Sequence, residues 1–146
     1  HDKEWVQMNH SFTKEKGTLR GMQFQHPPHS GIKRVRCIAG AVYDVIVDLR
    51  EESVTFLQHF GIELSAANRK MIYIPEGFAH GFITLADNSE LLYHHSRFYT
   101  PGAEGGLHYN DPRLGIQWPM TPVILSDRDQ QHAYIDNRFK GINTEK

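Results

Sequence analysis

The clearest pattern of apolar and polar positions along the chain lies at residues 41–49 (AVYDVIVDL). The segment is dense in β-branched residues and its side chains alternate, which predicts a β-strand. Because successive side chains on a strand point to opposite faces, two sets are expected. One face would carry Tyr43, Val45, Val47 and Leu49, and the other would carry Val42, Asp44, Ile46 and Asp48. Two carboxylates are therefore expected on one face of this strand.

Further short apolar segments are bounded by turn-forming residues. Strands are predicted at 35–38, 55–64, 70–74, 81–85 and 89–95, with turns such as PEG at 75–77 and ADN at 86–88. Many short strands with frequent turns favour an all-β sandwich, jelly roll or barrel. Near the C-terminus, Ser126 is a good N-cap and aspartates follow it, which predicts a short helical segment through Gln131.

Length and charge narrow the classes of protein further. The 146 residues, 1–146, are expected to form a single domain. A formal net charge of −1, without a run of Lys or Arg, argues against nucleic-acid binding. No apolar run reaches the roughly 20 residues of a membrane span. The single cysteine, Cys37, cannot form an internal disulfide, which fits a reducing compartment and predicts a cytoplasmic location.

Ten histidines raise the question of a metal site. Imidazole ligands must converge on one point, and the spacing here does not favour that. His26 and His29 are separated by two prolines, which places them in a loop. His94 and His95 are adjacent, so on a strand they would face opposite sides. No metal is therefore predicted, and no other cofactor is expected.

The motif PEGFAH at 75–80 combines a tight turn with a histidine, His80, at a defined place on the next strand. This P-x-G-x-x-H pattern resembles the second motif of cupin proteins, in which a histidine points into a β-barrel. A metal-binding cupin would carry H-x-H in its first motif, where this chain has Gln23-Phe24-Gln25. The alternative interpretation is a turn followed by a structural histidine.

Motifs along nearly the whole chain, in matching order and spacing, resemble one family. Residues 17–25 (GTLRGMQFQ) resemble the G-x-L-R-G-L-H-[FY]-Q segment of the dTDP-4-dehydrorhamnose 3,5-epimerases, and residues 33–37 (KRVRC) resemble their K-L-V-R-C. Further matches lie at 42–50, 53–56, 64–68, 74–82, 92–93, 104–106, 110–112, 115–119 and 125–129. The resemblance implies a cupin-like jelly-roll β-barrel, a homodimer and a dTDP-linked 4-keto-6-deoxyhexose as substrate.

The chemistry that the resemblance implies is proton abstraction beside a ketone. A base removes a proton from C3 or C5, a donor stabilises the enolate, and an acid returns a proton to the opposite face. Lys33 matches the lysine that stabilises the enolate, and Tyr93 matches the acid. Asp129 matches the aspartate that pairs with the base. The base itself is a histidine in the family, and its position here is occupied by Gln23.

The resemblance also implies a set of substrate-binding residues. They are Arg20 and His80 in the sugar pocket, Gln7, Asn9 and Phe98 on the nucleotide side, and in addition Asp44 and Glu104. Taken together with the strand alternation, the match predicts that Gln23, Lys33, Asp44, His80 and Tyr93 line one cavity.

Two departures from the family pattern bear on activity. A glutamine amide accepts hydrogen bonds but has no useful basicity near neutral pH, so Gln23 cannot act as the base. The candidates for a replacement are His26, His29, His94 and His95, and no spacing argument selects one. Gly31 stands where the family usually has a glutamine. The chain also begins, with His1, close to the WVQMN segment, whereas the family usually has a longer N-terminal segment that helps to bind nucleotide across the dimer.

The expected function is therefore enolisation of a nucleotide-linked 4-keto sugar, restricted to one position because the usual base is missing. Two alternatives stay open. One is a catalytically silent homologue that binds the sugar nucleotide, which Gln23 favours unless another base is present. The other is a 3,4-ketoisomerase-like activity, because related cupins also enolise these sugars.

Overall fold

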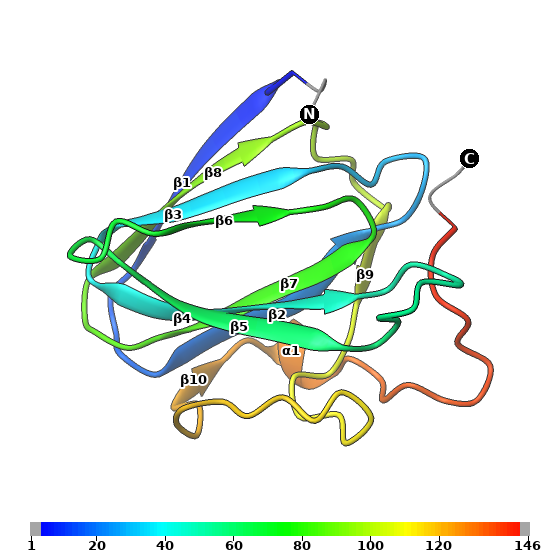
Figure 1. The fold of residues 1–146 in the computed structure, drawn as a ribbon. Helices are drawn as coiled ribbons and strands as arrows, with labels where there is room; N and C mark the ends of the chain where they lie inside the picture. Colours follow the sequence, from blue (N-terminus) through cyan, green and yellow to red (C-terminus); the bar gives the residue numbers. More distant parts are fainter. Residues whose placement is uncertain (1–3, 144–146) are drawn as a thin grey trace.

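The computed structural model describes residues 4–143, and the regular secondary structure of this part is almost entirely β-strand (Figure 1). The strands are β1 (Gln7–Thr13), β2 (Thr18–Gln25), β3 (Lys33–Ala39), β4 (Ala41–Asp48), β5 (His59–Ser65), β6 (Met71–Ile74), β7 (Phe78–Thr84), β8 (Ser89–His95), β9 (Glu104–Gly106) and β10 (Ile124–Leu125). One short helix, α1 (Asp127–Gln130), lies within the described residues. Ser126 caps it, since its side chain accepts a hydrogen bond from the Asp129 backbone N–H.

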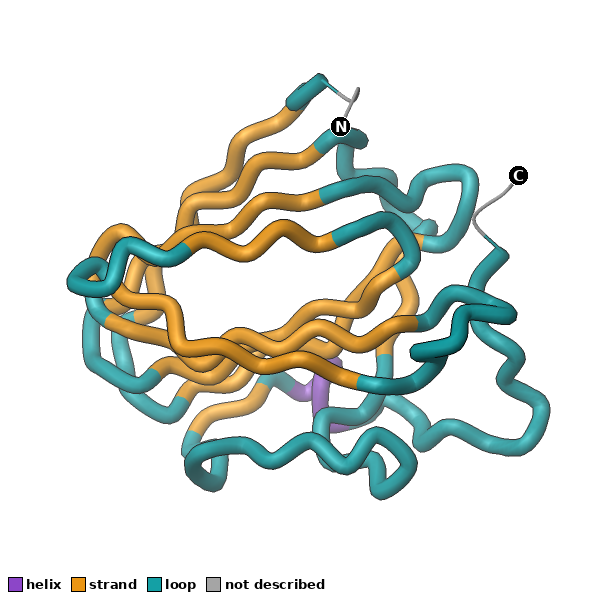
Figure 2. Tube along the Cα trace, viewed as in Figure 1, coloured by secondary structure: helices purple, strands orange, loops and turns teal. Residues whose placement is uncertain are grey.

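The strands form two sheets that lie over one another as the layers of a jelly roll (Figure 2). The first sheet has the order β1-β8-β3-β6, and the second has the order β10-β2-β7-β4-β5, with β9 also paired to β2. The pairings are antiparallel except for the short one between β10 and β2. The helix α1 contacts β2 and so lies at the edge of the second sheet. The predictions of an all-β fold and of a short C-terminal helix are confirmed.

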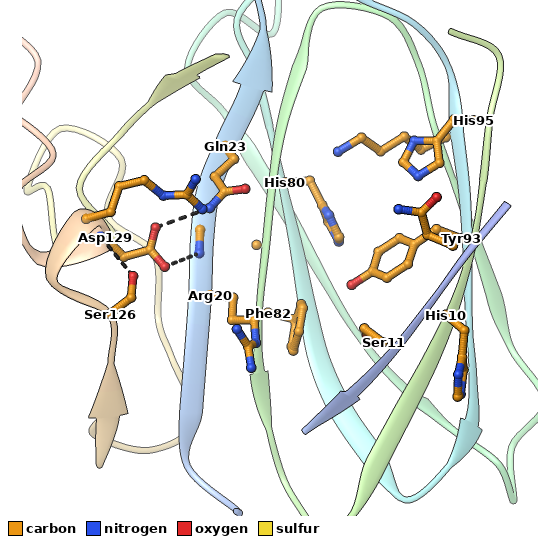
Figure 3. A pocket seen from close by; sticks show the side chains of 15 residues that line it. His10, Ser11, Arg20, Gln23, His80, Phe82, Tyr93, His95, Ser126 and Asp129 are labelled. Carbon is orange, nitrogen blue, oxygen red and sulfur yellow. Dashed lines mark hydrogen bonds between the residues drawn. The ribbon is translucent and has the colours of Figure 1, made fainter. Parts of the chain in front are cut away.

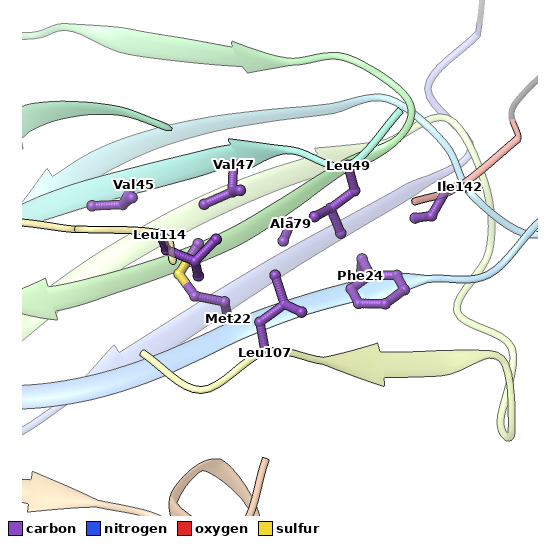
Figure 4. Close-up of a cluster of buried hydrophobic side chains, with 9 residues drawn as sticks. All are labelled: Met22, Phe24, Val45, Val47, Leu49, Ala79, Leu107, Leu114 and Ile142. Atoms are coloured by element: carbon purple, nitrogen blue, oxygen red, sulfur yellow. The ribbon is translucent and has the colours of Figure 1, made fainter. Parts of the chain in front are cut away.

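Strand β4 is central to the second sheet and is buried on both faces. Val45 and Val47 belong to one apolar cluster, whereas Val42 and Ile46 belong to another. The alternation predicted for this strand is thus confirmed. Residues that follow β9 complete the first cluster (Figure 4). They are Leu107, Leu114 and Ile142, and they pack against side chains of the second sheet and its connections, namely Met22, Phe24, Val45, Val47, Leu49 and Ala79.

The strand predicted at 55–64 is wrong in its first part, because residues 51–57 form turns and β5 begins only at His59. The buried carboxylate of Asp48 explains the difference. It accepts hydrogen bonds from the side chains of Arg50, Ser53 and Thr55. The segment therefore forms a loop around the Asp48 side chain instead of an extended strand. Burial alone would raise the pKa of Asp48, but these hydrogen bonds hold it well below its usual range. In addition, β7 begins at Phe78, before the predicted start at residue 81, and β1, β2, β9 and β10 lie outside the strands predicted from the pattern.

Candidate active site

A cavity of about 410 Å³ lies between the two sheets. The second sheet contributes Arg20 and Gln23 from β2 and His80 from β7. The first sheet contributes Lys33 from β3 and Tyr93 from β8. Tyr93 lies on the side of the cavity away from Gln23 (Figure 3). Ser126, Arg128 and Asp129 border the cavity beside β2. Residues separated by more than a hundred positions in the sequence therefore surround one space.

A β-bulge in β2 brings Arg20 and Gln23 to the same face. Arg20 pairs with Phe82 and Gln23 with His80, so three steps along β2 match two steps along β7. Without the extra residue, side chains three apart would point to opposite faces of the sheet. Gly21 permits the bulge, because a Cβ atom there would lie 2.7 Å from the Cα of Gly81 and from the carbonyl oxygen of His80.

Gln23 and Asp129 are in direct contact. The Gln23 amide donates a hydrogen bond from Nε2 to Asp129 Oδ1 at 3.3 Å, and the backbone N–H of Gly21 donates to Oδ2 at 3.2 Å. A carboxylate only accepts hydrogen bonds, so the amide turns its NH₂ group toward Asp129. A third contact comes from His132, whose Nε2 lies 3.2 Å from Oδ1. The contacts hold the buried Asp129 beside the cavity.

Asp44 and His80 form a buried pair behind the cavity wall. His80 Nε2 lies 2.7 Å from Asp44 Oδ1, and the two side chains are almost fully shielded from solvent. His80 lines the cavity, whereas Asp44 is not among the lining residues and supports His80 from behind. The prediction that Asp44 lines the cavity therefore needs correction. Its side chain points toward the space between the sheets, as expected, but His80 lies in front of it.

The environment shifts the proton equilibria of two further side chains. Burial lowers the pKa of the Lys33 ammonium below its ordinary value of 10.5, and the Asp44 carboxylate opposes part of that shift. Burial and the negative charge of Asp44 raise the pKa of the Tyr93 phenol above its ordinary value of 10.0. The ring of His80 meets that of Tyr93 edge-on, with centroids 6.1 Å apart. Tyr93 therefore keeps its proton near neutral pH.

The other residues expected to bind substrate differ in their place relative to the main cavity. Asn9 lines the cavity, and Gln7 next to it donates a hydrogen bond to the Asn9 side chain at 2.7 Å. Phe98 lies outside the cavity lining, with 65% of its surface exposed. Glu104 binds Arg128 at 3.1 Å and lines a smaller cavity of about 90 Å³. Gln23 and Lys33 line both cavities, so the two spaces adjoin.

The four histidines considered as replacement bases lie in different places. His26 packs edge-on against Phe24, and His29 lies 3.3 Å from the Thr100 hydroxyl. His94 points toward Trp5, with ring centroids 6.0 Å apart. Of these four, only His95 lines the main cavity.

Several cavity residues were not expected from the sequence to line the site. The lining also includes His10, Ser11, Phe82, Ser126 and Arg128. Phe82, Ser126 and Arg128 belong to motifs noted in the sequence, but only the folded chain shows that these five side chains line the cavity. His132 was likewise not expected, although it contacts Asp129.

Residues 4–143 contain neither a cluster of metal ligands nor a helix that could span a membrane. Within this range, no group of three or more His, Cys, Asp or Glu side chains is arranged to hold a metal ion. No helix in the same part of the chain has the length and apolar character needed to cross a membrane.

Comparison with known proteins identifies the family. The model of the dTDP-4-dehydrorhamnose 3,5-epimerase family matches residues 1–137. The chain belongs to this family. The resemblance drawn from the sequence motifs, and with it the expectation of an isomerase of this family, is therefore confirmed.

Individual relatives agree over most of the chain. The dTDP-4-dehydrorhamnose 3,5-epimerase of Salmonella typhimurium is 46% identical over 133 residues, which cover 90% of this chain and 72% of that protein. The epimerase of Legionella pneumophila, solved in complex with dTDP-4-keto-L-rhamnose, is 38% identical with a TM-score of 0.90, covering 97% of this chain and 77% of that one. A 3'-monoepimerase from Streptomyces bikiniensis, solved with dTDP-quinovose, is 33% identical with a TM-score of 0.82. The match covers 89% of this chain and 66% of that one. These similarities confirm the cupin-like jelly-roll fold of the epimerase family.

Proposed function

We propose that this chain binds a dTDP-linked 4-keto-6-deoxyhexose in the main cavity and enolises it next to the ketone. The observation that carries the proposal is that Lys33, Tyr93, Gln23 and Asp129 line one cavity of about 410 Å³. The protonated Lys33 stabilises the negative charge that forms on the ketone oxygen, and Tyr93 serves as proton donor. Arg20 and His80 hold the sugar, and the Asn9 side of the cavity receives the nucleotide.

The activity is restricted because Gln23 stands where the family resemblance places a histidine base. Its amide can donate a hydrogen bond to Asp129, as the imidazole would, but it cannot accept a proton from carbon. Inversion at both C3 and C5 by the usual route is therefore not expected. The relative from Streptomyces bikiniensis is described as a 3'-monoepimerase, so single-position activity occurs among similar proteins.

Solvent deuterium exchange tests the proposal. The chain is incubated with dTDP-4-keto-6-deoxyglucose in D₂O, and proton NMR follows the C3 and C5 signals while calorimetry measures binding of dTDP. We expect binding together with exchange at one carbon. The Tyr93→Phe and Lys33→Met variants should exchange more slowly, because each loses a group that acts on the enolate. Failure to bind dTDP or the sugar nucleotide would contradict the proposal.

A catalytically silent sugar-nucleotide-binding protein is the second candidate. The amide of Gln23 favours it, since the group that contacts Asp129 in the position of the family's histidine has no useful basicity. Tight binding without deuterium uptake at either carbon would establish this candidate. A 3,4-ketoisomerase-like activity, by contrast, would be recognised in the same spectra by formation of the 3-keto sugar.

A homodimer is also part of the proposal. The outer face of the first sheet carries large apolar side chains that are well exposed, and such a surface is typical of an interface. They are Met8, Phe12, Ile38, Met71 and Tyr73. Strands β1 and β6 are the edges of this sheet and would need covering. Sedimentation velocity at micromolar concentration should give a dimer, and a monomer would contradict this part. A single domain over 1–146, the cytoplasmic location and the independence of metal or cofactor stay predictions.

A further inference from the structure

His95 occupies a position in the site that its neighbour His94 does not share. The side chain of His95 lines the main cavity and also the smaller one, together with Gln23 and Lys33. Adjacent residues on β8 point to opposite faces, which turns His94 outward to Trp5. His95 therefore lies where the two cavities adjoin.

The neighbours of His95 are the groups that handle the substrate in the proposed function. Its ring stacks on that of Tyr93, with centroids 6.0 Å apart and an interplanar angle of 21°. In the pairing of β3 with β8, it is the register partner of Lys33. All three residues belong to the first sheet, whereas Gln23 belongs to the second. Figure 3 shows His95 and Tyr93 across the cavity from Gln23. The imidazole is thus close to the enolate-stabilising lysine and on the wall opposite the glutamine.

The surroundings of His95 keep its imidazole neutral. Burial lowers the pKa of His95 to about 4, and the positive charges of Lys33, His80 and His94 add to the shift. A weak base of this kind is sufficient beside a stabilised enolate, since ketosteroid isomerase uses a carboxylate with a pKa of about 4.6. Other titratable or charged groups near it are Tyr93 on its own strand and those that line either cavity with it. They are Arg97, Tyr99 and Glu104 in the smaller cavity and His10, Arg20, Arg128 and Asp129 in the main one.

We propose that His95 is the general base of this site and removes the substrate proton on the side of the sugar that faces β8. The inference rests on the proposed function and deepens it. A ring nitrogen of His95 takes the proton from the carbon next to the 4-keto group. The electrons of the broken C–H bond form the C=C bond of the enolate, and the ketone oxygen takes up the negative charge beside Lys33.

The position of His95 has a stereochemical consequence. The proton returns either from His95 or from Tyr93, and both lie on the first sheet. Protonation of the enolate carbon from that side restores the C–H bond, the ketone and the original configuration. Inversion needs a proton donor on the opposite wall, where the amide of Gln23 cannot serve as an acid. His80 also lies on that wall, but Asp44 holds its ring, and the proposed function assigns it to binding the sugar. The rate of hydrogen exchange with solvent should therefore exceed the rate of epimerisation.

The test compares two neighbouring histidines. Wild type, His95→Gln and the matched control His94→Gln are incubated with dTDP-4-keto-6-deoxyglucose in D₂O. NMR measures the exchange rate and the configuration of the labelled carbon, and calorimetry measures dTDP binding. We expect wild type and His94→Gln to exchange with retention of configuration at similar rates. His95→Gln should exchange about 10²- to 10⁴-fold more slowly, the usual contribution of a general base. Unchanged dTDP binding verifies that each variant is folded.

Each other outcome counts against the assignment. Exchange by His95→Gln at the wild-type rate, or inversion at the exchanged carbon in wild type, would show that another group is the base. Lack of exchange in wild type that binds the sugar nucleotide would overturn the assignment in favour of the silent homologue. Lack of binding by wild type would instead reject the proposed function, and the assignment with it. Should His95→Gln fail to fold, the same comparison is made with His95→Asn.

Discussion

The amide of Gln23 donates to Asp129 Oδ1 across 3.3 Å, which joins strand β2 to helix α1 at the border of the cavity. A histidine in place of Gln23 could direct one ring N–H to the same carboxylate and keep its second nitrogen for the substrate. The aspartate needed to orient such a ring is therefore already in place.

Replacing Gln23 by histidine should raise the rate of inversion next to the ketone. A positioned general base contributes typically about 10²- to 10⁴-fold, and a gain within that range is expected. The rate is measured by NMR as conversion of dTDP-4-keto-6-deoxyglucose to its epimer. Gln23→Asn is the matched control and should gain nothing. If Gln23→His still binds dTDP but gains nothing either, the pocket has diverged beyond this one residue.

The exchange rate should depend on pH in a way set by His95 and Lys33. The lowered pKa of His95, about 4, means that the base is available above that pH, so the rate should rise through about pH 4 and then level off. Lys33 must be protonated, and its pKa lies below the ordinary 10.5, so the rate should fall again at a pH below 10.5. Exchange rates of wild type measured from pH 3.5 to 10.5 cover both the rise at acidic pH and the fall at alkaline pH. A rise near pH 6.5, the ordinary histidine value, would argue against this environment for His95.

Asp44→Asn should move the fall in exchange rate at alkaline pH, the alkaline limb of the profile, to lower pH. The carboxylate of Asp44 favours the protonated form of Lys33, so removing its charge lets Lys33 lose its proton more readily. The pH–rate profiles of wild type and Asp44→Asn are compared directly, with Asp127→Asn, an exposed aspartate of α1, as control. A limb that stays in place or moves to higher pH would mean that Lys33 is not the group responsible.

Gly21→Ala should cost far more stability than Gly102→Ala. Both glycines have positive φ, +116° and +84°, but only at Gly21 would a Cβ atom meet backbone atoms, at 2.7 Å. The backbone strain alone should cost Gly102→Ala about 1–2 kcal/mol. Strain and overpacking together should cost Gly21→Ala about 2–5 kcal/mol. Urea denaturation measures both free energies of unfolding. Equal losses would show that β2 and β7 can move apart and that the bulge does not depend on this glycine.

The sequence alone determined much of the fold and the family. The alternation at 41–49 depends only on which side chains along one strand are buried on each face. It therefore predicted β4 and the division of its side chains between two clusters. The turn residues and the N-cap at Ser126 are equally local, and they placed several strands and α1. Motif order then identified the family. Where a long-range contact decides, as with Asp48 and the loop at 51–57, the local pattern misled.

Only the tertiary structure decided how the site is assembled. Alternation requires His94 and His95 to face opposite ways, but which of them faces the cavity depends on how β8 packs against the other sheet. The bulge that turns Arg20 and Gln23 to one face depends on the close approach of Gly21 to β7. Gln23 and Asp129 are 106 positions apart and meet only because α1 lies beside β2. Such contacts depend on the arrangement of whole sheets, and local periodicity carries no information about that arrangement.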